Sequence, residues 1–386
     1  MRAADTVISA DNLEYRQAWT ISCTSRRAVV SIHRTMTQLW LILLLLLAVC
    51  RHCSAEAHII HILNCPLVAG GTCPESSVRF ILFTRSNPSD GVLVDVDEVP
   101  PIFNTSHPTK VLIHGYNSGM EVLFDIRDAY LANGDYNVIM LDWNKISLSP
   151  CYPTAVYNAR FVGKCSAQMI QRLRGMGAED IHLVGFSLGA HVTGFTANHL
   201  RPYKLPRITG LDPAMPLFVT VPKDGKLDAT DAQFVDVMHT NAFFQGKAEQ
   251  MGQVDIYMNG GVDQPGCAFE SSFLSCNHHR AVAYFTESIK GDTGLWAWKC
   301  RGLLQYALGM CPPSGIPQLI GEFIDYSARG LHICKTNDRS PFALGKWWAN
   351  GSDRLRYSVD REESCGILRA LQIPHPTIVQ LQSSKV

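Results

Sequence analysis

The chain has no long hydrophobic run and no excess of charge of either sign. Its longest apolar stretch, residues 40–49, is about half as long as the roughly 20 residues that a membrane-spanning helix needs. Lysine plus arginine number 34, as do aspartate plus glutamate, so no basic stripe or acidic tail indicates a nucleic-acid partner. No repeat of fixed period is visible, which argues against a solenoid or propeller. The 386 residues can bury one large core or two smaller ones.

The short apolar run suits the core of a secretory signal peptide. Small residues follow it, and cleavage after Ala55 is expected. We therefore predict an upstream extension over residues 1–35, which a misassigned start would explain, and a signal peptide over residues 36–55. The alternative is a signal-anchor with the basic residues of the extension as its flank. The shortness of the run favours a secreted, extracellular protein.

Cysteine usage agrees with an oxidising compartment. Ten of the 13 cysteines follow Ala55, none with the Cys-x-x-Cys spacing of a zinc site, so five disulfides are expected. Cys65 and Cys73 are eight residues apart and are predicted to pair locally. Asn104 and Asn350 begin glycosylation sequons, which are used only in the secretory pathway.

Apolar runs alternate with stretches of helical spacing through residues 78–289. Strands are expected at residues 78–84, 110–114, 136–143, 181–186, 207–211, 234–239 and 254–257, and helices at residues 121–131, 154–173, 188–200 and 279–289. The connections are long enough for crossovers, so the pattern predicts an α/β fold with a mainly parallel sheet and helices on both faces. We expect one domain over residues 56–366 and a tail over residues 367–386.

A Gly-x-Ser-x-Gly motif follows one of the expected strands and opens a helix. Ser187 is therefore predicted at the apex of a sharp strand–turn–helix, with its hydroxyl exposed at the carboxyl edge of the sheet. A Cβ at Gly185 or Gly189 would crowd the strand and helix that close on the turn.

A serine hydroxyl is a useful nucleophile only when a base takes its proton and an acid orients that base. Asp212 directly follows a short strand, which places its carboxylate at the same sheet edge as Ser187. Asp142 ends another strand and is the competing acid. The chain order serine, acid, histidine favours Asp212.

The base should come later in the chain, where His239, His278, His279 and His332 are available. His239 ends an apolar strand, where a histidine can be purely structural. His278 follows Cys276 on a loop directly before a predicted helix. Because such a loop can reach over the sheet edge, we favour His278.

Two backbone N–H groups are expected to form an oxyanion hole. One belongs to Leu188, the residue after the nucleophile. The other belongs to Tyr116, in the loop after the strand at residues 110–114, where Gly115 permits a tight bend.

Six stretches in order resemble the pancreatic-lipase family of secreted neutral lipases, especially its insect members. They are residues 112–116 (LIHGY), 184–191 (VGFSLGAH), 208–214 (ITGLDPA), 231–240 (DAQFVDVMHT), 259–261 (NGG) and 276–278 (CNH). The resemblance covers about residues 65–345. It implies the α/β-hydrolase fold and the same five site residues that the chain's own pattern indicates.

The chain departs from the triglyceride lipases of this family at the lid. In those enzymes a longer, disulfide-bounded lid covers the site, whereas the matching pair here, Cys267 and Cys276, encloses only residues 268–275. That segment is too short for an amphipathic helix that would bury the site. The loop at residues 241–253 also looks trimmed. Both features resemble the branch that cleaves the sn-1 ester of phospholipids.

Aromatic residues near the site suggest lipid contact. The candidates for contact with acyl chains or membrane are Phe243, Phe244, Phe269 and Phe273. Four tryptophans, at positions 296, 298, 347 and 348, are either lipid contacts or core residues. Cys300 and Cys311 are expected to pair with each other.

No cofactor is expected, and the one metal considered is a structural calcium. Lys226, Asp228 and Asp231 occupy the stretch that matches the family's calcium loop, so a structural calcium is the alternative to plain turn residues. The family's C-terminal β-sandwich has no counterpart in the sequence, so no colipase-type docking is expected. The expected partner is a lipid substrate at a membrane or lipid–water interface.

The sequence thus predicts a secreted serine ester hydrolase acting on lipids. The favoured activity is that of a phospholipase A1, which releases the sn-1 fatty acid through an acyl-enzyme. A triacylglycerol lipase or galactolipase is the alternative within this class. The alternative from another class is a non-catalytic lipid-binding or yolk-type storage protein, which the three filled triad positions disfavour.

Overall fold

The computed structural model describes residues 58–348, except 74, 269–271 and 292, together with residues 21–23, 26–28 and 367. Contacts divide the chain into two units, residues 1–56 and 57–386. The first contains an antiparallel pair, β1 (Ile21–Cys23) and β2 (Arg26–Ala28). The expected signal peptide lies outside the described residues. Within the described part of the chain, no helix has the length and apolarity needed to span a bilayer.

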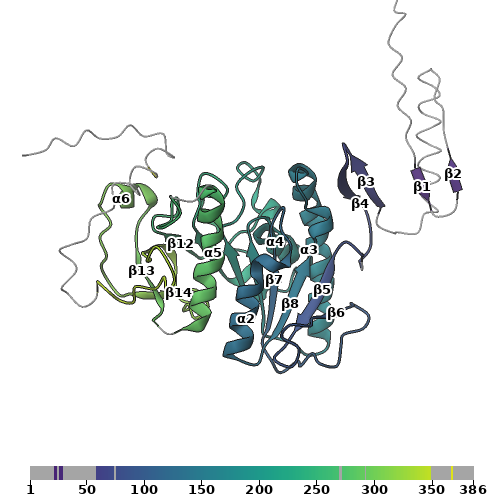
Figure 1. The fold of residues 1–386 in the computed structure, drawn as a ribbon, viewed down its shortest axis with the longest axis horizontal. Helices are drawn as coiled ribbons and strands as arrows, with labels where there is room; N and C mark the ends of the chain where they lie inside the picture. Colours follow the sequence, from purple (N-terminus) through teal and green to yellow (C-terminus); the bar gives the residue numbers. More distant parts are fainter. Residues whose placement is uncertain are drawn as a thin grey trace, which may run out of the picture. The chain divides into compact units, whose positions relative to one another are not determined.

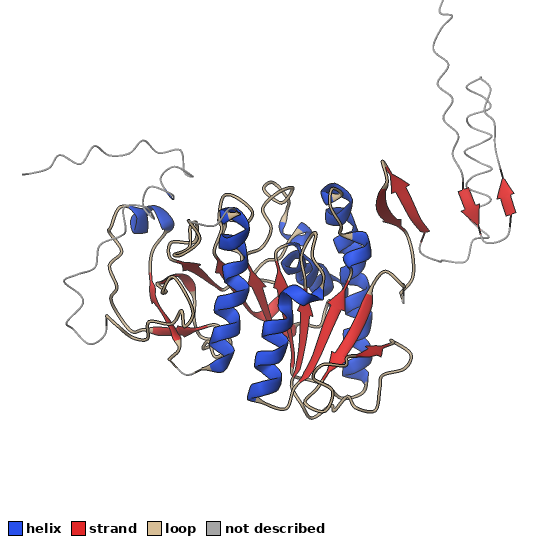
Figure 2. Ribbon diagram, viewed as in Figure 1, coloured by secondary structure: helices blue, strands red, loops and turns tan. Residues whose placement is uncertain are grey.

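A large, mainly parallel sheet forms the centre of the second unit (Figures 1 and 2). Its strands are β5 (Arg79–Phe83), β6 (Val92–Val94), β7 (Thr109–Ile113), β8 (Asn137–Asp142), β9 (Ile181–Phe186), β10 (Leu205–Leu211), β11 (Ala232–His239), β12 (Val254–Met258), β13 (Leu295–Lys299), β14 (Gln318–Ile320) and β15 (Gly330–Cys334). Their order is β14-β13-β15-β12-β11-β10-β9-β7-β8-β5-β6. The strands from β15 to β8 run parallel, and the outer strands are antiparallel to their inner neighbours.

Helices cover both faces of this sheet, as the alternating pattern predicts. They are α2 (Phe124–Asn133), α3 (Tyr152–Gly175), α4 (Leu188–Leu200), α5 (Phe273–Lys290) and the short α6 (Leu303–Ala307), with 3₁₀ turns η1 (Met120–Leu123), η2 (Asn144–Ile146) and η3 (Lys223–Gly225). Helices α3 and α4 pack together, and so do α2 and α5. Along β7, Val111 and Ile113 join the core beneath α3 and α4, whereas Leu112 joins the core beneath α2 and α5. A fully buried strand thus supplies both hydrophobic cores, and the architecture is that of the α/β-hydrolase fold.

The two ends of the second unit hold strands that periodicity did not predict. A hairpin of β3 (His58–Ile62) and β4 (Cys65–Ala69) precedes the sheet. At the other end, β13, β14 and β15 extend the sheet beyond β12. These strands have only three to five residues each, too few for a hydrophobic period to stand out. The four tryptophans resolve as core residues, because Trp298 and Trp348 are fully buried and Trp296 and Trp347 pack against the same cluster.

Disulfides tie this N-terminal segment to α3 rather than to itself. The predicted local pairing of Cys65 with Cys73 is wrong: Cys65 bonds to Cys151 and Cys73 bonds to Cys165. The strand β4 lies against α3, so a cysteine on the helix is nearer than one along the segment.

Two other expected pairs, Cys267–Cys276 and Cys300–Cys311, are confirmed. Cys334 is buried and has no disulfide partner among the described residues. Cys365 lies outside the described residues, so the expected fifth disulfide stays a prediction.

Candidate active site

Ser187 lies at the sharp turn between β9 and α4. Its backbone has φ 56° and ψ −120°, a conformation that non-glycine residues rarely adopt and that costs roughly 1–3 kcal/mol. Hydrogen bonds hold the turn in place: the N–H of Ser187 donates to Leu211 O at 2.9 Å, and the N–H of Ala214 donates to Ser187 O at 3.2 Å. The strained turn presents the side chain at the carboxyl edge of the sheet.

The two glycines of the motif are required by close packing. A Cβ on Gly185 would lie 2.7 Å from the Cα of Ala190, and a Cβ on Gly189 would lie 2.6 Å from His114 O. A Cβ on Gly115 would lie 2.7 Å from the Cβ of Ser187. The loop after β7 therefore packs directly on the turn that carries Ser187.

Asp212 follows β10 and is fully buried. Its Oδ1 accepts the N–H of Thr240 at 2.8 Å and the N–H of Asn241 at 3.0 Å. Its Oδ2 lies 2.6 Å from Nδ1 of His278. Two donors thus fix one carboxylate oxygen, while the other is directed at the imidazole, the arrangement in which an acid orients a base.

His278 is buried and lies in the second turn of α5, not on a loop before a helix. The helix begins six residues earlier than predicted, because Cys276, Asn277 and the two histidines give little local helical signal. The ring packs on Phe186, with the centroids 4.6 Å apart. A helix fixes this imidazole more rigidly than the expected loop would.

Ser187 and His278 line one cavity of about 400 Å³ at this edge of the sheet. Polar side chains share the lining: Asn117, Ser118 and Gln245 from loops, and Ser275 and His279 from α5. Tyr116, Tyr152, Phe186, Ala214 and Pro216 complete it. Sequence reasoning missed Tyr152 and Gln245, since only their position in the fold, and no motif, brings them to the site.

The competing residues have other partners. Asp142 pairs with Arg79 and His114, and the hydrogen bond from His114 is the main reason that its pKa lies below the usual range. His239 is buried between two acceptors, with Nδ1 2.8 Å from Lys247 O and Nε2 2.9 Å from Asp255. Both groups have structural partners that account for their burial.

The predicted oxyanion loop is held rigidly beside Ser187. His114 is buried, and its carbonyl accepts the indole N–H of Trp143 at 2.9 Å. Tyr116 follows and packs edge-to-face on Tyr152, with the centroids 4.9 Å apart. Leu188 begins α4, where the first N–H groups of a helix have no intrahelical partner. Both backbone positions adjoin the serine.

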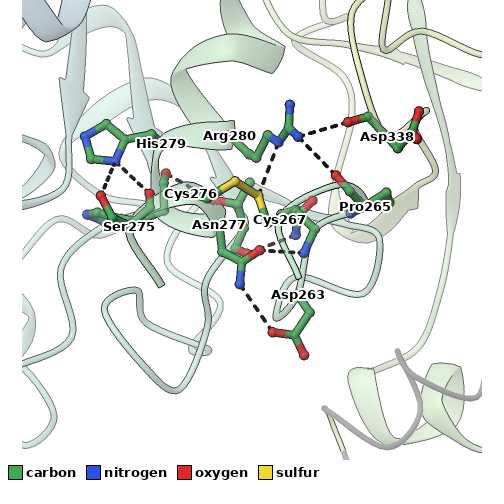
Figure 3. Close-up of a disulfide and its surroundings, with 12 residues drawn as sticks. Asp263, Pro265, Cys267, Ser275, Cys276, Asn277, His279, Arg280 and Asp338 are labelled. Atoms are coloured by element: carbon green, nitrogen blue, oxygen red, sulfur yellow. Dashed lines mark hydrogen bonds between the residues drawn. A yellow bond between two sulfur atoms is a disulfide. The ribbon is translucent and has the colours of Figure 1, made fainter. Parts of the chain in front are cut away.

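The disulfide at the ends of the short Cys267–Cys276 segment joins Cys267 to the first turn of α5, where Cys276 lies (Figure 3). Arg280 fixes its base: the guanidinium donates to Pro265 O at 3.1 Å and to Asp338 O at 2.9 Å. Phe269 lies outside the described residues, and so does the side chain of Phe273. Of the other two predicted lipid contacts, Phe244 is exposed and Phe243 packs against a buried cluster.

The loop predicted as an alternative calcium site fits a cation only in part. Oδ2 of Asp228 and Oδ1 of Asp231 are buried without a hydrogen-bond partner, and carboxylate oxygens suit Ca²⁺. The side chain of Lys226 instead pairs with Glu249 at 2.7 Å, and Arg201 lies 3.8 Å from Asp231 Oδ1. No group of three or more histidine, cysteine or acidic side chains suited to a metal occurs in the part of the chain that the structure describes.

Comparison with known proteins gives one family. The model of the lipase family matches residues 67–342. Lipase member H-A of Xenopus laevis is 36% identical over 245 residues, 61% of this chain and 53% of that protein. Lipase member H of Oryctolagus cuniculus is 35% identical over 65% of this chain and 58% of its own length.

Pancreatic lipase-related protein 2 of Cavia porcellus is 33% identical over 302 residues, 73% of this chain and 67% of that protein. The chain therefore spans between about half and two thirds of the length of these relatives. The matched region contains every residue of the cavity described above.

Proposed function

The chain belongs to the pancreatic-lipase family, and from this premise we propose that it is a carboxylic-ester hydrolase acting on lipids through Ser187, His278 and Asp212. The observation that carries the proposal is the 2.6 Å contact between His278 and Asp212, on a base that shares a cavity wall with Ser187. An oriented imidazole beside a strained serine is the arrangement that acyl transfer needs.

In the proposed reaction, the Ser187 oxygen attacks the acyl carbonyl while Nε2 of His278 takes its proton. The charge that develops on the carbonyl oxygen is stabilised by the N–H groups of Tyr116 and Leu188. Collapse of the tetrahedral intermediate breaks the ester bond, and His278 returns the proton to the leaving alcohol. Water then repeats the sequence on the acyl-enzyme and releases the fatty acid, with Asp212 stabilising the imidazolium in both halves.

Within this class we favour a phospholipase A1 that releases the sn-1 chain. The segment between Cys267 and Cys276 is too short for an amphipathic helix that would cover the mouth, so a charged head group should be able to enter. The polar side chains around the cavity, among them Gln245 and His279, offer hydrogen bonds that a triglyceride would not use. The alternatives are a triacylglycerol lipase or galactolipase and, outside catalysis, a lipid-storage protein.

A fluorophosphonate probe tests the catalytic proposal. We expect the folded protein to be labelled at Ser187, and Ser187→Ala to lose both labelling and ester hydrolysis. Replacing the exposed Ser89 by alanine is the matched control and should change neither. Absence of labelling in folded protein would favour the storage role.

The substrate proposal is tested separately, with phosphatidylcholine labelled at either acyl position and with triolein. Release of the sn-1 chain, with slower release from triolein, is expected. Rapid hydrolysis of triolein with none of phosphatidylcholine would replace the phospholipase by a triacylglycerol lipase.

Secretion is part of the same proposal. The four disulfides of the structure are of a kind that forms in oxidising compartments. A signal peptide at residues 36–55 would bring the chain there.

A further inference from the structure

We propose that the β3–β4 hairpin is a lipid-surface anchor beside the mouth of the catalytic cavity. The inference rests on the proposed action on lipids, because it concerns how the protein reaches that substrate. The hairpin stands beside α3, outside the layers of the central sheet (Figure 1).

The hairpin exposes apolar side chains where a water-facing strand would carry polar ones. Its register pairs Ile59 with Val68 and Ile60 with Leu67. Val68 is buried against the protein, whereas its partner Ile59 on the same face is 39% exposed. On the opposite face Ile60 and Ile62 are 46% and 48% exposed, and Leu63 at the turn is 93% exposed.

No charge accompanies this exposed surface. Residues 58–69 contain no aspartate, glutamate, lysine or arginine. Soluble proteins commonly protect short, exposed strands with charged side chains, lysine above all. An uncharged hairpin with a protruding leucine is instead suited to a medium that solvates hydrocarbon.

The position of the hairpin links it to the site. Cys65, directly after the turn, is bonded to Cys151, and the next residue, Tyr152, lines the catalytic cavity. Asn158 of α3 binds the backbone of β4 at two points: its Oδ1 accepts the N–H of Val68 at 2.9 Å, and its Nδ2 donates to Pro66 O at 2.9 Å. The exposed turn is therefore rigidly fixed close to the cavity mouth.

Exposed apolar residues continue from the hairpin around that mouth. Leu148 is 42% exposed and accepts the N–H of Cys151 through its carbonyl. Leu217 is 56% exposed and follows Pro216, whose carbonyl accepts the Tyr152 hydroxyl at 2.9 Å. Phe244, at 41%, precedes the cavity residue Gln245. In the proposed binding mode, one lipid surface contacts both this rim and the hairpin. The same lipid surface contains the substrate.

A lipid surface fits this region better than a protein partner. Protein-binding hot spots are rich in tryptophan, tyrosine and arginine within a hydrogen-bonding rim, and the hairpin contains none of those three residue types. Insertion of apolar side chains needs no such partners. The alternatives, in which a second copy of the chain or another protein covers the hairpin, are distinguished by the experiment below.

The test measures binding of the full chain to phosphatidylcholine vesicles by co-sedimentation. The variant Ile60→Thr/Ile62→Thr/Leu63→Asn keeps strand formers in β3 and places asparagine at φ 51°, where it is favoured over leucine. Losing even one aliphatic side chain that is buried in the lipid should weaken the affinity for vesicles about tenfold. We expect the variant to bind at least about tenfold more weakly and to hydrolyse a soluble short-chain ester at the wild-type rate.

Matched controls separate the anchor from other causes. Ile316→Asn removes an equally exposed aliphatic residue, 92% exposed, in the loop before β14, and should leave vesicle binding unchanged. Leu63→Asn alone tests the turn if the triple variant does not fold. Binding is measured with Ser187→Ala protein, so that no lipid is consumed and failure of the catalytic proposal does not affect the result.

Unchanged vesicle binding by a folded hairpin variant would overturn the proposal. The proposal would also be overturned if the wild-type chain elutes as a dimer and the triple variant elutes as a monomer. The exposed face of the hairpin would then be an interface between two copies of the chain. Loss of soluble-ester hydrolysis by Ser187→Ala with vesicle binding retained supports both proposals independently.

Discussion

At the scale of single residues, the site depends on two strained backbones placed side by side. Ser187 and Asp212 both have positive φ, 56° and 41°, and each such residue costs roughly 1–3 kcal/mol. The N–H of Asp212 donates to Met238 O at 2.7 Å, so the neighbouring strand over-determines its position. The surroundings therefore position the reactive groups, and small changes there should affect catalysis more than stability.

Gly246 is the sharpest example of such a change. A Cβ on this residue would lie 2.5 Å from Cγ of Asp212, against the carboxylate that orients His278. Gly246→Ala should displace that carboxylate, and a displacement of ~1 Å can cost about 100-fold in rate. We expect kcat on a soluble ester to fall by about that factor while KM changes little.

Gly175→Ala is the matched control, because a Cβ there meets nothing within 4 Å. Its kcat should equal that of the wild type. Full activity in a folded Gly246→Ala variant would show that the carboxylate tolerates displacement and would weaken the role proposed for Asp212.

These residues also show what a sequence can and cannot predict about a site. Ser187 carries its own signal, since two glycines, a strand and a helix surround it within a few residues. Asp212 could be chosen by chain order and its place at a strand end, and His278 by its place after Cys276 and before a predicted helix. The structure brings the two together. Gly246 and Tyr152 gave no signal, because their importance comes from contacts with residues far away in the chain.

At the scale of elements, α3 is the point to which the N-terminal segment is fixed. Two disulfides and the hydrogen bonds of Asn158 join that segment to the helix. The cysteines in these bonds are separated by 86 and 92 residues. Removing such a link frees far more chain in the unfolded state than removing a short one.

The Cys73–Cys165 and Cys300–Cys311 disulfides offer a direct comparison, with separations of 92 and 11 residues. Loop-closure entropy gives about 4.7 kcal/mol for a ~100-residue loop and about 3 kcal/mol for a ~15-residue loop. The double alanine variant of the first pair should therefore unfold at a temperature about 3 °C below that of the second, measured by calorimetry. Equal losses would mean that local packing, and not chain entropy, sets the contribution of these bonds.

The elements themselves were predictable in proportion to their length and burial. The strands β7, β8 and β9 are buried along their whole length and lie within one residue of the expected bounds. The strands β13 and β14 were missed because they are short and antiparallel at the edge of the sheet, where pairing with β15 rather than local sequence determines them. The predicted pairing of Cys65 with Cys73 failed for a related reason, since spacing along the chain does not reveal which helix a segment lies against.

At the scale of the whole molecule, buried charges should make stability depend on pH. Most of them are compensated: Lys110 pairs with Glu322 at 2.7 Å, and Arg207 pairs with Asp236 at 2.8 Å. Asp231 differs, because burial, the largest cause, raises its pKa to about 8. Its carboxyl is therefore protonated in the folded protein at neutral pH but ionised in the unfolded chain, whose pKa is near 3.8.

This raised pKa fixes the direction of the pH effect. Between about pH 4 and pH 8 the folded state binds a proton that the unfolded state lacks, so stability should fall as pH rises through that window, by up to about 1.4 kcal/mol per unit. Asp231→Asn should flatten that fall, because an amide does not titrate between pH 4 and pH 8. The fold should tolerate the change, because the amide oxygen can still accept the N–H of Asp228, now bonded at 2.9 Å. The measurement is the urea midpoint from pH 4 to pH 8 in a chelator. Asp90→Asn, at an exposed carboxylate, should leave the slope unchanged.

Adding calcium to the same experiment should have the opposite pH dependence. An ion held by Asp228 and Asp231 would favour their ionised forms, so millimolar calcium should stabilise the protein more at pH 8 than at pH 5, and Asp231→Asn should abolish that difference. Stabilisation equal at both pH values would place any bound ion elsewhere. If calcium has no effect and the slope in chelator persists, the buried carboxyl of Asp231 stays protonated in the folded protein, and Arg201, 3.8 Å away, does not offset the cost of its burial. The contribution of this one carboxyl to stability is then lost as the pH rises through its folded pKa of about 8.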